Sequence, residues 1–399
     1  MKHQFFFVLL LFSTTIKPTV FSIKSIYDLM LQDDTIRFYK LHDPIAFEYQ
    51  PFPLTEQSYW QPHQGALDQS GIFIIPHGKF HPCVYLSADN KITAFQACYT
   101  YDKNNNLIKE FLGSDHSLLL QVERLQLKKY PLNSAKKISG KVVIIADIAS
   151  DFYANWMIKT LAKVAMLQTL NIEYDWICTL HHHKYMKETL QLLGIDASKI
   201  IEPILDYECL QADELIVPSV PARFIPPQNN HNYAQAHLMS LYAPSWHLSW
   251  LREKFLPLAQ QHCSNHNFCT KVFLSRNDAA RKINNEDDVF AYFEQKGFKK
   301  YTLTNLSFLE QIQLFHQATH IIGTHGSNMT NIIFCNPDTQ IIELFQNQLD
   351  SSYWFISQQL KFQHHCIKVA KSISGDRYIS TDACLDTIKR YISQTLPEL

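Results

Sequence analysis

The sequence predicts an α/β protein with two doubly wound regions. Short, fully apolar runs of strand length alternate with helical stretches between residues 141 and 218, and again between residues 271 and 345. Such runs are typical of parallel strands that are covered by helices on both faces. The 399 residues suffice for two or three domains with sizeable cores.

The charge balance argues against nucleic acid as a partner. Lys and Arg number 36 against 37 Asp and Glu, which gives a net charge of −1 and no global field to attract a polyanion. Any anion site must therefore be local. The nine cysteines are scattered, odd in number and without a Cys-x-x-Cys pair, which is unlike a disulfide framework or a zinc site.

The first 22 residues form a hydrophobic segment. A short polar start precedes the apolar run 5–12, which is far shorter than the ~20 residues that span a bilayer. We interpret residues 1–22 as a secretory signal with cleavage after Ser22, and a buried or amphipathic segment is the alternative. A signal would place the protein in the secretory pathway or an endomembrane lumen. Without one, it would be cytoplasmic or membrane-associated.

The N-terminal lobe is expected to combine an accessory β-rich segment with a parallel sheet. Aromatic and β-branched runs predict accessory strands at 72–75, 84–86 and 91–99. Strands at 141–146, 174–180 and 214–217 then alternate with helices at 155–170 and 184–193. Ligands of such sheets bind beyond the carboxyl ends of the strands, where Asp147, Asp151 and Asn155 would lie. The run from His181 to His183 also follows a strand, and we interpret it as a solvated loop.

A mixed stretch at 228–267, with a helical patch at 250–258, links the two regions. We place the domain boundary near Ser264, which gives an N-terminal lobe at 23–263 and a C-terminal lobe at 264–399. In the second lobe we expect strands at 271–275, 298–303, 319–323 and 340–345. Asn284 or Asn285 would cap a helix that ends at Gly297, Ser307 begins another helix with a capping box, and a third helix covers 329–334.

Two loops at the carboxyl edge of the second sheet are suited to a diphosphate. The first carries Arg276 and Arg281, whose planar guanidinium groups can each meet two phosphate oxygens. The second is a small polar turn that offers backbone N–H groups and a helix dipole. It consists of Thr324, His325, Gly326, Ser327 and Asn328. Surface pairing of the two arginines with Asp278, Glu286 or Asp287 is the alternative.

Two further residues of this lobe admit more than one interpretation. Glu343 lies inside an apolar strand, where an ionised carboxylate is costly without a partner. A ribose hydroxyl pair, or an Arg or Lys from a neighbouring strand, would supply that partner. His325 either donates a hydrogen bond to a diphosphate or sugar hydroxyl, or caps local backbone groups.

Three segments resemble glycosyltransferase family 61 in order and spacing. They are LSRNDAARKINNE at 274–286, SFLEQIQLF at 307–315 and IIGTHGSNMTNIIFCNPDTQIIELF at 321–345. The likeness is weaker at 150–167. There Asn155 replaces the family's usual His, Lys159 or Thr160 replaces its acidic residue, and Ala162-Lys163 replaces its Pro-Arg. Ser327 stands where the family usually has Ala.

The resemblance implies a GT-B-like architecture, in which two Rossmann-like lobes face a cleft. It also implies inverting transfer of a hexose or pentose from a nucleotide sugar, expected to be a UDP-sugar, to a glycan, polysaccharide or glycoprotein hydroxyl. No metal or other cofactor is expected, and the sequence contains no Asp-x-Asp triplet. The nucleotide sugar would be bound by Ser275, Arg276, Arg281, Glu286, Thr324, His325, Gly326, Ser327, Asn328 and Glu343.

Inverting transfer in one displacement needs a base beside the acceptor hydroxyl. Asp151 is our candidate from its position, with His325 and the run His181 to His183 as fallbacks. A helix N-cap is the alternative role of Asp151. Two other functions stay open at this point, namely a protein of the same fold that binds a nucleotide or sugar without turnover, and a GT-B nucleotide-sugar epimerase.

Overall fold

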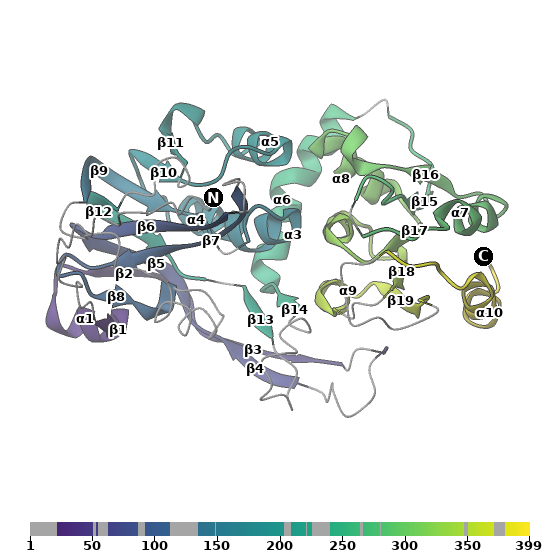
Figure 1. Cartoon of the computed structure of the whole chain (residues 1–399), viewed down its shortest axis with the longest axis horizontal. Helices are drawn as coiled ribbons and strands as arrows, with labels where there is room; N and C mark the ends of the chain where they lie inside the picture. The colour runs from purple at the N-terminus through teal and green to yellow at the C-terminus, as the bar shows by residue number, and fades with distance from the viewer. Residues whose placement is uncertain are drawn as a thin grey trace, which may run out of the picture.

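The protein is described by a computed structural model in which two sheets lie side by side with helix α6 (Ser245–His262) between them (Figure 1). It covers residues 22–50, 53–54, 63–86, 92–111, 135–147, 149–202, 209–220, 222–225, 240–263, 266–279, 281–346, 350–370 and 380–399. Apart from Ser22, the predicted signal segment lies outside these residues. Within the described ranges, no helix combines the length and the apolar character needed to cross a membrane.

The first sheet has a parallel centre, as predicted. Its strands run in the order β12 (Leu210–Pro218), β9 (Lys136–Ile144), β10 (Trp176–Cys178) and β11 (Ile200–Ile201). Helix α5 (Lys184–Leu192) follows β10 and ends just before Gly194, whose φ of 74° favours glycine.

The helix predicted at 155–170 consists of three successive segments. They are α3 (Tyr153–Asn155), a π-helix (Trp156–Thr160) and α4 (Leu161–Thr169). The π-helix is buried along its whole length, and α4 is buried from Leu161 to Leu167. A π-helical turn widens the helix and shifts the faces on which the following side chains lie.

The accessory strands exist but do not form a separate sheet. Strands β5 (Ser70–Pro76) and β6 (Lys79–Leu86) both pair antiparallel with β12 and extend the first sheet. The run from Ser70 to Ile75 is buried on both faces, which requires an interior position. The same sheet also includes β1 (Ile23–Lys24), β2 (Arg37–His42), β7 (Ile92–Tyr101) and β8 (Leu107–Ile108). Helix α1 (Ile26–Gln32) lies between β1 and β2 in the chain.

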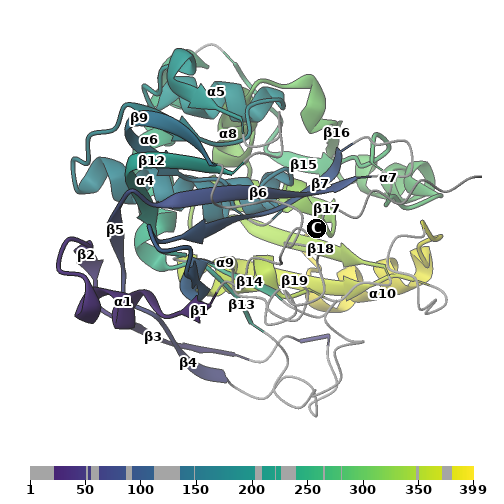
Figure 2. The same ribbon diagram turned by 60° about the vertical axis from the view of Figure 1, so that its left-hand side comes forward.

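Two hairpins lie outside the large sheets. One pairs β3 (Ile45–Tyr49) with β4 (His63–Leu67), and the other pairs β13 (Arg223–Ile225) with β14 (Ser240–Tyr242). Figure 2 shows both on the side of the molecule where α9 and β19 lie. Leu67 and Tyr242 share a small core with Phe345 and Phe355 of the second lobe. The N-terminal hairpin therefore contacts the C-terminal lobe.

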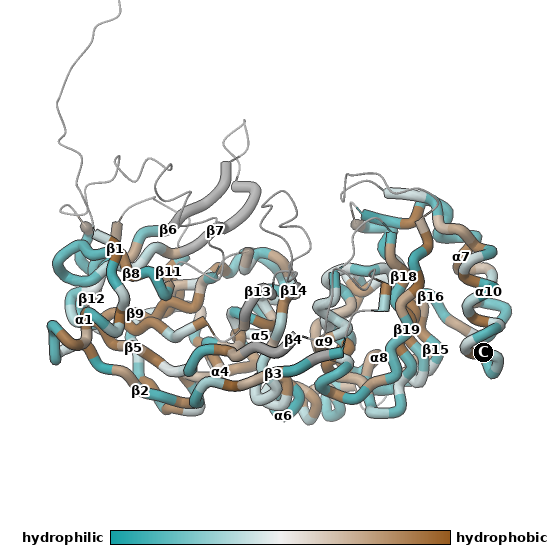
Figure 3. Tube along the Cα trace, turned by 90° about the horizontal axis from the view of Figure 1, so that it is seen from below, coloured by the Kyte–Doolittle hydropathy of each residue, from teal (hydrophilic) through white to brown (hydrophobic). Residues whose placement is uncertain are grey.

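The second sheet is entirely parallel. Its order is β16 (Lys299–Tyr301), β15 (Lys271–Leu274), β17 (His320–Thr324), β18 (Gln340–Phe345) and β19 (Gln363–Lys368). Helices α7 (Glu286–Glu294) and α10 (Leu385–Thr395) lie on one side of these largely hydrophobic strands, and α8 (Phe308–Gln317) and α9 (Ser352–Leu360) on the other (Figure 3). The predicted capping box of Ser307 and Glu310 is confirmed at the start of α8.

Helix α6 joins the two lobes through packing. It contacts α8 and the 3-10 helix η8 (Ser327–Phe334) of the second lobe, and α4 of the first. The guanidinium of Arg252 donates to the backbone oxygens of Ile333 and Cys335, the latter at 2.8 Å. One hydrophobic core accordingly continues from the first sheet into the second.

Candidate functional site

The topology brings the two predicted anion-binding loops together. In chain order the second sheet runs 2-1-3-4-5, so its order reverses between β15 and β17, and the loops after these two strands lie side by side at the carboxyl edge. There, Nη1 of Arg276 donates a hydrogen bond to the backbone oxygen of His325 over 2.9 Å. The two residues that we expected to converge are in direct contact.

Arg276 is a buried cation with an unpaired donor. Arg276 is only 8% exposed, and its Nε atom has no hydrogen-bond partner among the described residues. Burial lowers the pKa of the Arg276 guanidinium, and the nearby charge of Arg281 lowers that pKa further. Such a group is costly without a counter-charge, so this position is suited to an anion.

The surface pairing considered for Arg276 is not observed. Asp287 forms an ion pair with Lys300 at 2.6 Å, and Asp278 accepts a hydrogen bond from the hydroxyl of Thr304 at 2.7 Å. In the part of the chain that the structure describes, no ion pair involves Arg276. Its charge is therefore not neutralised by direct contact with a carboxylate.

Ser275 and Glu286 form hydrogen bonds that fix the loop carrying Arg276. The hydroxyl of Ser275 donates to Oε1 of Glu286 at 2.6 Å, and the backbone N–H of Arg276 donates to Oε2 at 2.9 Å. Glu286 is 1% exposed, and both of its oxygens are already occupied by protein donors. These hydrogen bonds give Ser275 and Glu286 a role in supporting the loop, and their contact with a nucleotide sugar stays a prediction.

The guanidinium of Arg276 packs directly against Gly326. Its φ of 151° and ψ of 178° lie in a region that only glycine occupies readily. A Cβ at this position would stand 1.2 Å from Nη1 of Arg276. Glycine is therefore required at position 326 for two reasons. Other residues do not readily adopt its backbone conformation, and the Arg276 side chain leaves no space for a Cβ atom.

The turn continues into η8, which replaces the helix predicted at 329–334. Thr324 is buried, whereas Ser327 and Asn328 are partly exposed at the first positions of η8. The first N–H of this helix to meet a backbone acceptor is that of Met329, which donates to Gly326 at 2.8 Å. The N–H groups of Ser327 and Asn328 precede that bond, as the donors of an anion site do.

Glu343 has a partner that we did not predict. Its Oε1 lies 2.6 Å from Nδ1 of His325, and its Oε2 lies 3.1 Å from Nε2 of His364. The carboxylate is fully buried, and the side chains beside its two oxygens are these histidines instead of an Arg or Lys. Burial raises the pKa of Glu343, while the neighbouring His325 acts in the opposite direction. Binding of the nucleotide sugar by Glu343 stays a prediction.

The imidazole of His325 is packed between aromatic rings. Phe345 stacks on it with ring centres 5.1 Å apart, and the ring of Tyr353 lies 5.3 Å away. Its Nε2 is 3.9 Å from Oδ2 of Asp350. Tyr353, Asp350 and His364 were missed because they lie beyond residue 345, and the run His364-His365 inside a strand was the available signal.

Asp147 lies beyond the carboxyl end of β9, as expected, but its carboxylate is paired inside the protein. It is buried and forms ion pairs with Nζ of Lys159 at 3.0 Å and of Lys163 at 2.9 Å. Burial alone would raise the pKa of Asp147, but the two ammonium groups outweigh it and hold that pKa well below its usual value. Lys159 and Lys163 stand where the sequence departs from the family pattern, and they neutralise a buried carboxylate.

Asp151 lies in the loop that leads into α3. The cap residue of α3 is Phe152 and makes no side-chain capping bond, so the N-cap role considered for Asp151 is wrong. The hydroxyl of Tyr185 donates to the backbone oxygen of Asp151 at 2.7 Å. Helix α3 contacts η8, where Tyr153 donates to Asn331 at 2.5 Å. The Asp151 loop therefore adjoins the helix that begins at Ser327.

The other predicted polar residues of the first lobe are two histidines in a loop and Asn155. His182 and His183 are exposed in a loop, as we interpreted them, and His183 stacks on Tyr185 at 5.3 Å. Asn155 is half-buried, and its Oδ1 lacks a hydrogen-bond partner among the described residues. Neither the stacking of His183 nor the position of Asn155 assigns a chemical role to these residues.

One cluster has the composition of a metal site. Glu343, His364 and Cys366 place ligand atoms within 4.8 Å of one another. The carboxylate is already hydrogen-bonded to the imidazole of His325, and burial raises the pKa of the Cys366 thiol. These features suit a hydrogen-bonded network better than a set of metal ligands.

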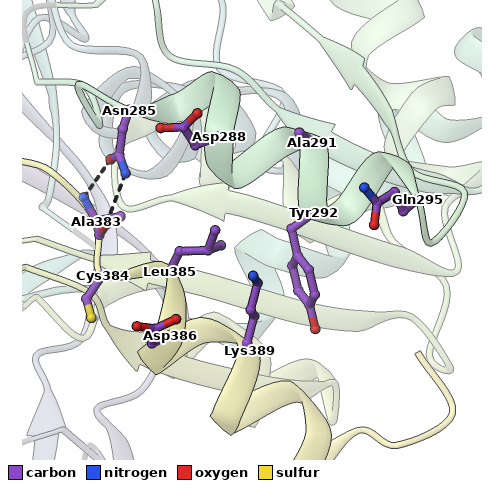
Figure 4. A pocket seen from close by; sticks show the side chains of 10 residues that line it. All are labelled: Asn285, Asp288, Ala291, Tyr292, Gln295, Ala383, Cys384, Leu385, Asp386 and Lys389. Atoms are coloured by element: carbon purple, nitrogen blue, oxygen red, sulfur yellow. Dashed lines mark hydrogen bonds between the residues drawn. The ribbon is translucent and has the colours of Figure 1, made fainter.

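A separate pocket lies between α7 and α10, and none of the residues predicted to bind a ligand lines it (Figure 4). Tyr292, Lys389 and Cys384 are among its lining residues. Asn285 lies at its end and exchanges two hydrogen bonds with the backbone of Ala383, at 2.8 and 3.1 Å. Asn285 is the cap residue of α7, but this pairing replaces the side-chain capping bond that we expected.

Residues 153–342 match the family model described as Glycosyltransferase 61. The match begins at α3 of the first lobe and ends one residue before Glu343, so it includes both loops that carry Arg276 and His325. No curated protein matches the chain.

Proposed function

We propose that this protein, whose residues 153–342 match the model of glycosyltransferase family 61, transfers a sugar from a nucleotide sugar to a hydroxyl group of a glycan, polysaccharide or glycoprotein. The observation that carries this proposal is the contact of Arg276 with the turn at His325, where a buried guanidinium keeps an unpaired Nε. A nucleoside diphosphate supplies the anion that this position lacks. We take the two sheets to be the lobes of a GT-B architecture, with the donor on the second lobe.

In the proposed reaction the protein itself stabilises the departing diphosphate. Arg276, Arg281 and the N–H groups of Ser327 and Asn328 would take up the negative charge that grows as the sugar leaves. Each charge-assisted contact contributes about 1.5–3 kcal/mol. This set of donors supports transfer without a required metal ion, from a UDP-sugar in our proposal.

The acceptor is proposed to bind on the first lobe, with Asp151 as the base. Inverting transfer needs a carboxylate or imidazole within hydrogen-bond reach of the attacking hydroxyl. Asp151 is half-buried in the loop that leads into α3, and α3 contacts η8 of the donor lobe. Asp147 is excluded from this role by its two lysine partners.

A panel of UDP-, GDP- and dTDP-sugars, incubated with glycan acceptors and analysed by mass spectrometry, tests the proposal. We expect one donor class to give a product that is longer by one sugar, and Arg276→Ala to abolish it. Affinity for a nucleotide sugar without product or hydrolysis would contradict transfer and indicate a binding protein. Conversion of the donor to its epimer without an acceptor would indicate an epimerase.

A further inference from the structure

A chain of hydrogen bonds connects α3 of the first lobe to the interior of the second lobe. The hydroxyl of Tyr153 on α3 donates to Oδ1 of Asn331 on η8 at 2.5 Å. Nδ2 of Asn331 donates to Oε1 of Gln311 on α8 at 3.1 Å, and Nε2 of Gln311 donates to the backbone oxygen of Leu303 at 3.0 Å. Each amide accepts with its oxygen and donates with its nitrogen, so the chain is continuous from α3 to the segment that follows β16.

Asn331 anchors Tyr153 close to the proposed diphosphate site. It is fully buried, and it is the fifth residue of η8, which begins at Ser327. Four residues of 3-10 helix span about 8 Å, so the hydroxyl of Tyr153 meets η8 little more than one turn from its first N–H groups. The anchor therefore lies near the donor site without being one of the groups proposed to bind the donor.

Tyr185 fixes the Asp151 loop from a second helix. Its hydroxyl donates to the backbone oxygen of Asp151 at 2.7 Å, and its ring packs edge-on against that of Tyr153 with ring centres 5.1 Å apart. Tyr185 lies on α5, where Oε2 of Glu188 accepts from the backbone N–H of Phe308, the first residue of α8, at 3.1 Å. Both tyrosines thus belong to helices that are hydrogen-bonded to the second lobe.

Two further hydrogen bonds close the loop on itself. The backbone N–H of Phe152 donates to the oxygen of Ala149 at 3.0 Å, and the hydroxyl of Ser150 donates to the oxygen of Asp147 at 2.5 Å. A general base must come within about 2.6–3.2 Å of the hydroxyl that it deprotonates. The place of this loop therefore decides whether Asp151 can act on an acceptor.

The contacts of the two tyrosines are not needed to keep the lobes together. Helix α6 packs against both lobes, and one hydrophobic core continues from the first sheet into the second. Loss of a single tyrosine hydroxyl should therefore leave the lobes joined. It should change only where the Asp151 loop lies relative to η8.

We propose that Tyr153, Asn331 and Tyr185 are positioning residues that hold Asp151 where it can deprotonate an acceptor hydroxyl. The inference rests on the proposed function, in which Asp151 is the base. In the transfer step the acceptor oxygen attacks the anomeric carbon of the donor sugar, the bond from that carbon to the diphosphate breaks, and the hydroxyl proton passes to the carboxylate of Asp151. Transfer depends on this alignment, whereas binding of the nucleotide does not.

Steady-state kinetics test the inference with the donor and acceptor that the panel of UDP-, GDP- and dTDP-sugars identifies. We expect Tyr153→Phe and Tyr185→Phe each to lower kcat by about ten- to hundredfold, because small misplacements of a catalytic group are that costly. Calorimetric titration with UDP and GDP should give wild-type affinities. Tyr301→Phe is the matched control, because the hydroxyl of Tyr301 accepts from the backbone N–H of Cys269 at 3.0 Å within the second lobe. It should retain the wild-type kcat.

Combination with Asp151→Asn separates positioning from packing. Asp151→Asn removes the carboxylate that the tyrosines are proposed to place, so Tyr153→Phe should slow this variant much less than it slows the wild type. An effect through packing alone would be equal in both backgrounds. If Tyr153→Phe does not fold, Tyr185→Phe serves in the same comparison, because it leaves the hydrogen bonds of Asn331 intact.

Three results would overturn the inference. The first is wild-type kcat in folded Tyr153→Phe and Tyr185→Phe variants. The second is equal slowing by these substitutions with and without the carboxylate of Asp151. The third is a loss of UDP or GDP affinity as large as the loss of kcat. If the wild type neither binds a nucleotide nor transfers a sugar, the proposed function fails as well, whereas transfer that is insensitive to both tyrosines refutes only this inference.

Discussion

At the scale of single residues, Arg276 has the least compensated charge in the candidate site. Its Nε is buried without a partner among the described residues, and Nη1 of the same guanidinium donates to the backbone oxygen of His325. We predict that Arg276→Ala weakens binding of UDP or GDP by about 2 kcal/mol or more. Calorimetric titration measures this, with exposed Arg390→Ala on α10 as the control. Equal affinity of both variants would remove Arg276 from the site.

Gly326 gives a second prediction at this scale. Gly326→Ala introduces a methyl group at the position of Nη1 of Arg276 and adds backbone strain of about 1–3 kcal/mol. We expect lower thermal stability together with loss of nucleotide binding. Gly194→Ala is the matched control, because Gly194 also has positive φ, at 74°, but has no atom within 4 Å of the added Cβ. It should lose stability alone, and nucleotide binding by Gly326→Ala would refute the role of this contact.

At the scale of elements, the ion pairs of Asp147 fasten the end of β9 to the helices behind it. Asp147→Asn leaves Lys159 and Lys163 buried without a counter-charge, which should lower the free energy of unfolding by about 3–5 kcal/mol. Asp33→Asn is the control, because Asp33 pairs with Lys103 at the surface and should cost at most about 1 kcal/mol. Urea titrations near neutral pH compare them, and equal losses would contradict this account.

The same carboxylate predicts a dependence of stability on pH. The pKa of Asp147 is lower in the folded protein than its ordinary value of about 4 in an unfolded chain. Its contribution is therefore complete above about pH 4 and is lost as the pH falls below that value. Between about pH 5 and pH 3 the wild type should lose more stability than Asp147→Asn. Urea titrations at the two pH values measure this, and an equal loss of stability in the wild type and in Asp147→Asn would contradict the prediction.

At the scale of elements, the sequence predicted those features that depend on residues close together in the chain. Apolar runs located the parallel strands, and Ser307 with Glu310 located the start of α8, because period and capping depend on neighbours in the chain. The partners of β5 and of Glu343 could not be found in this way. β12 lies far along the chain from β5, and His364 belongs to a strand that the motif does not include. The convergence of Arg276 and His325 was predictable because sheet topology places the loops after neighbouring strands together.

At the scale of the whole molecule, α6 belongs to the packing of both lobes. Its Arg252 donates to the backbone of η8, and its apolar residues share one core with both sheets. A division at residue 264 cuts this helix away from α8 and η8. We predict that a fragment of residues 240–399 folds cooperatively, whereas a fragment of residues 266–399 does not. Circular dichroism during heating distinguishes them, and a sharp transition in the shorter fragment would contradict a shared core.

The most direct test of the central claim is a crystal structure of the protein with UDP. We predict that a phosphate oxygen lies within about 3 Å of Nε of Arg276 and of the N–H groups that begin η8. The first lobe should then face the phosphates with the loop that carries Asp151. A diphosphate bound elsewhere, for instance in the pocket between α7 and α10, with Nε of Arg276 still unpaired, would contradict the claim.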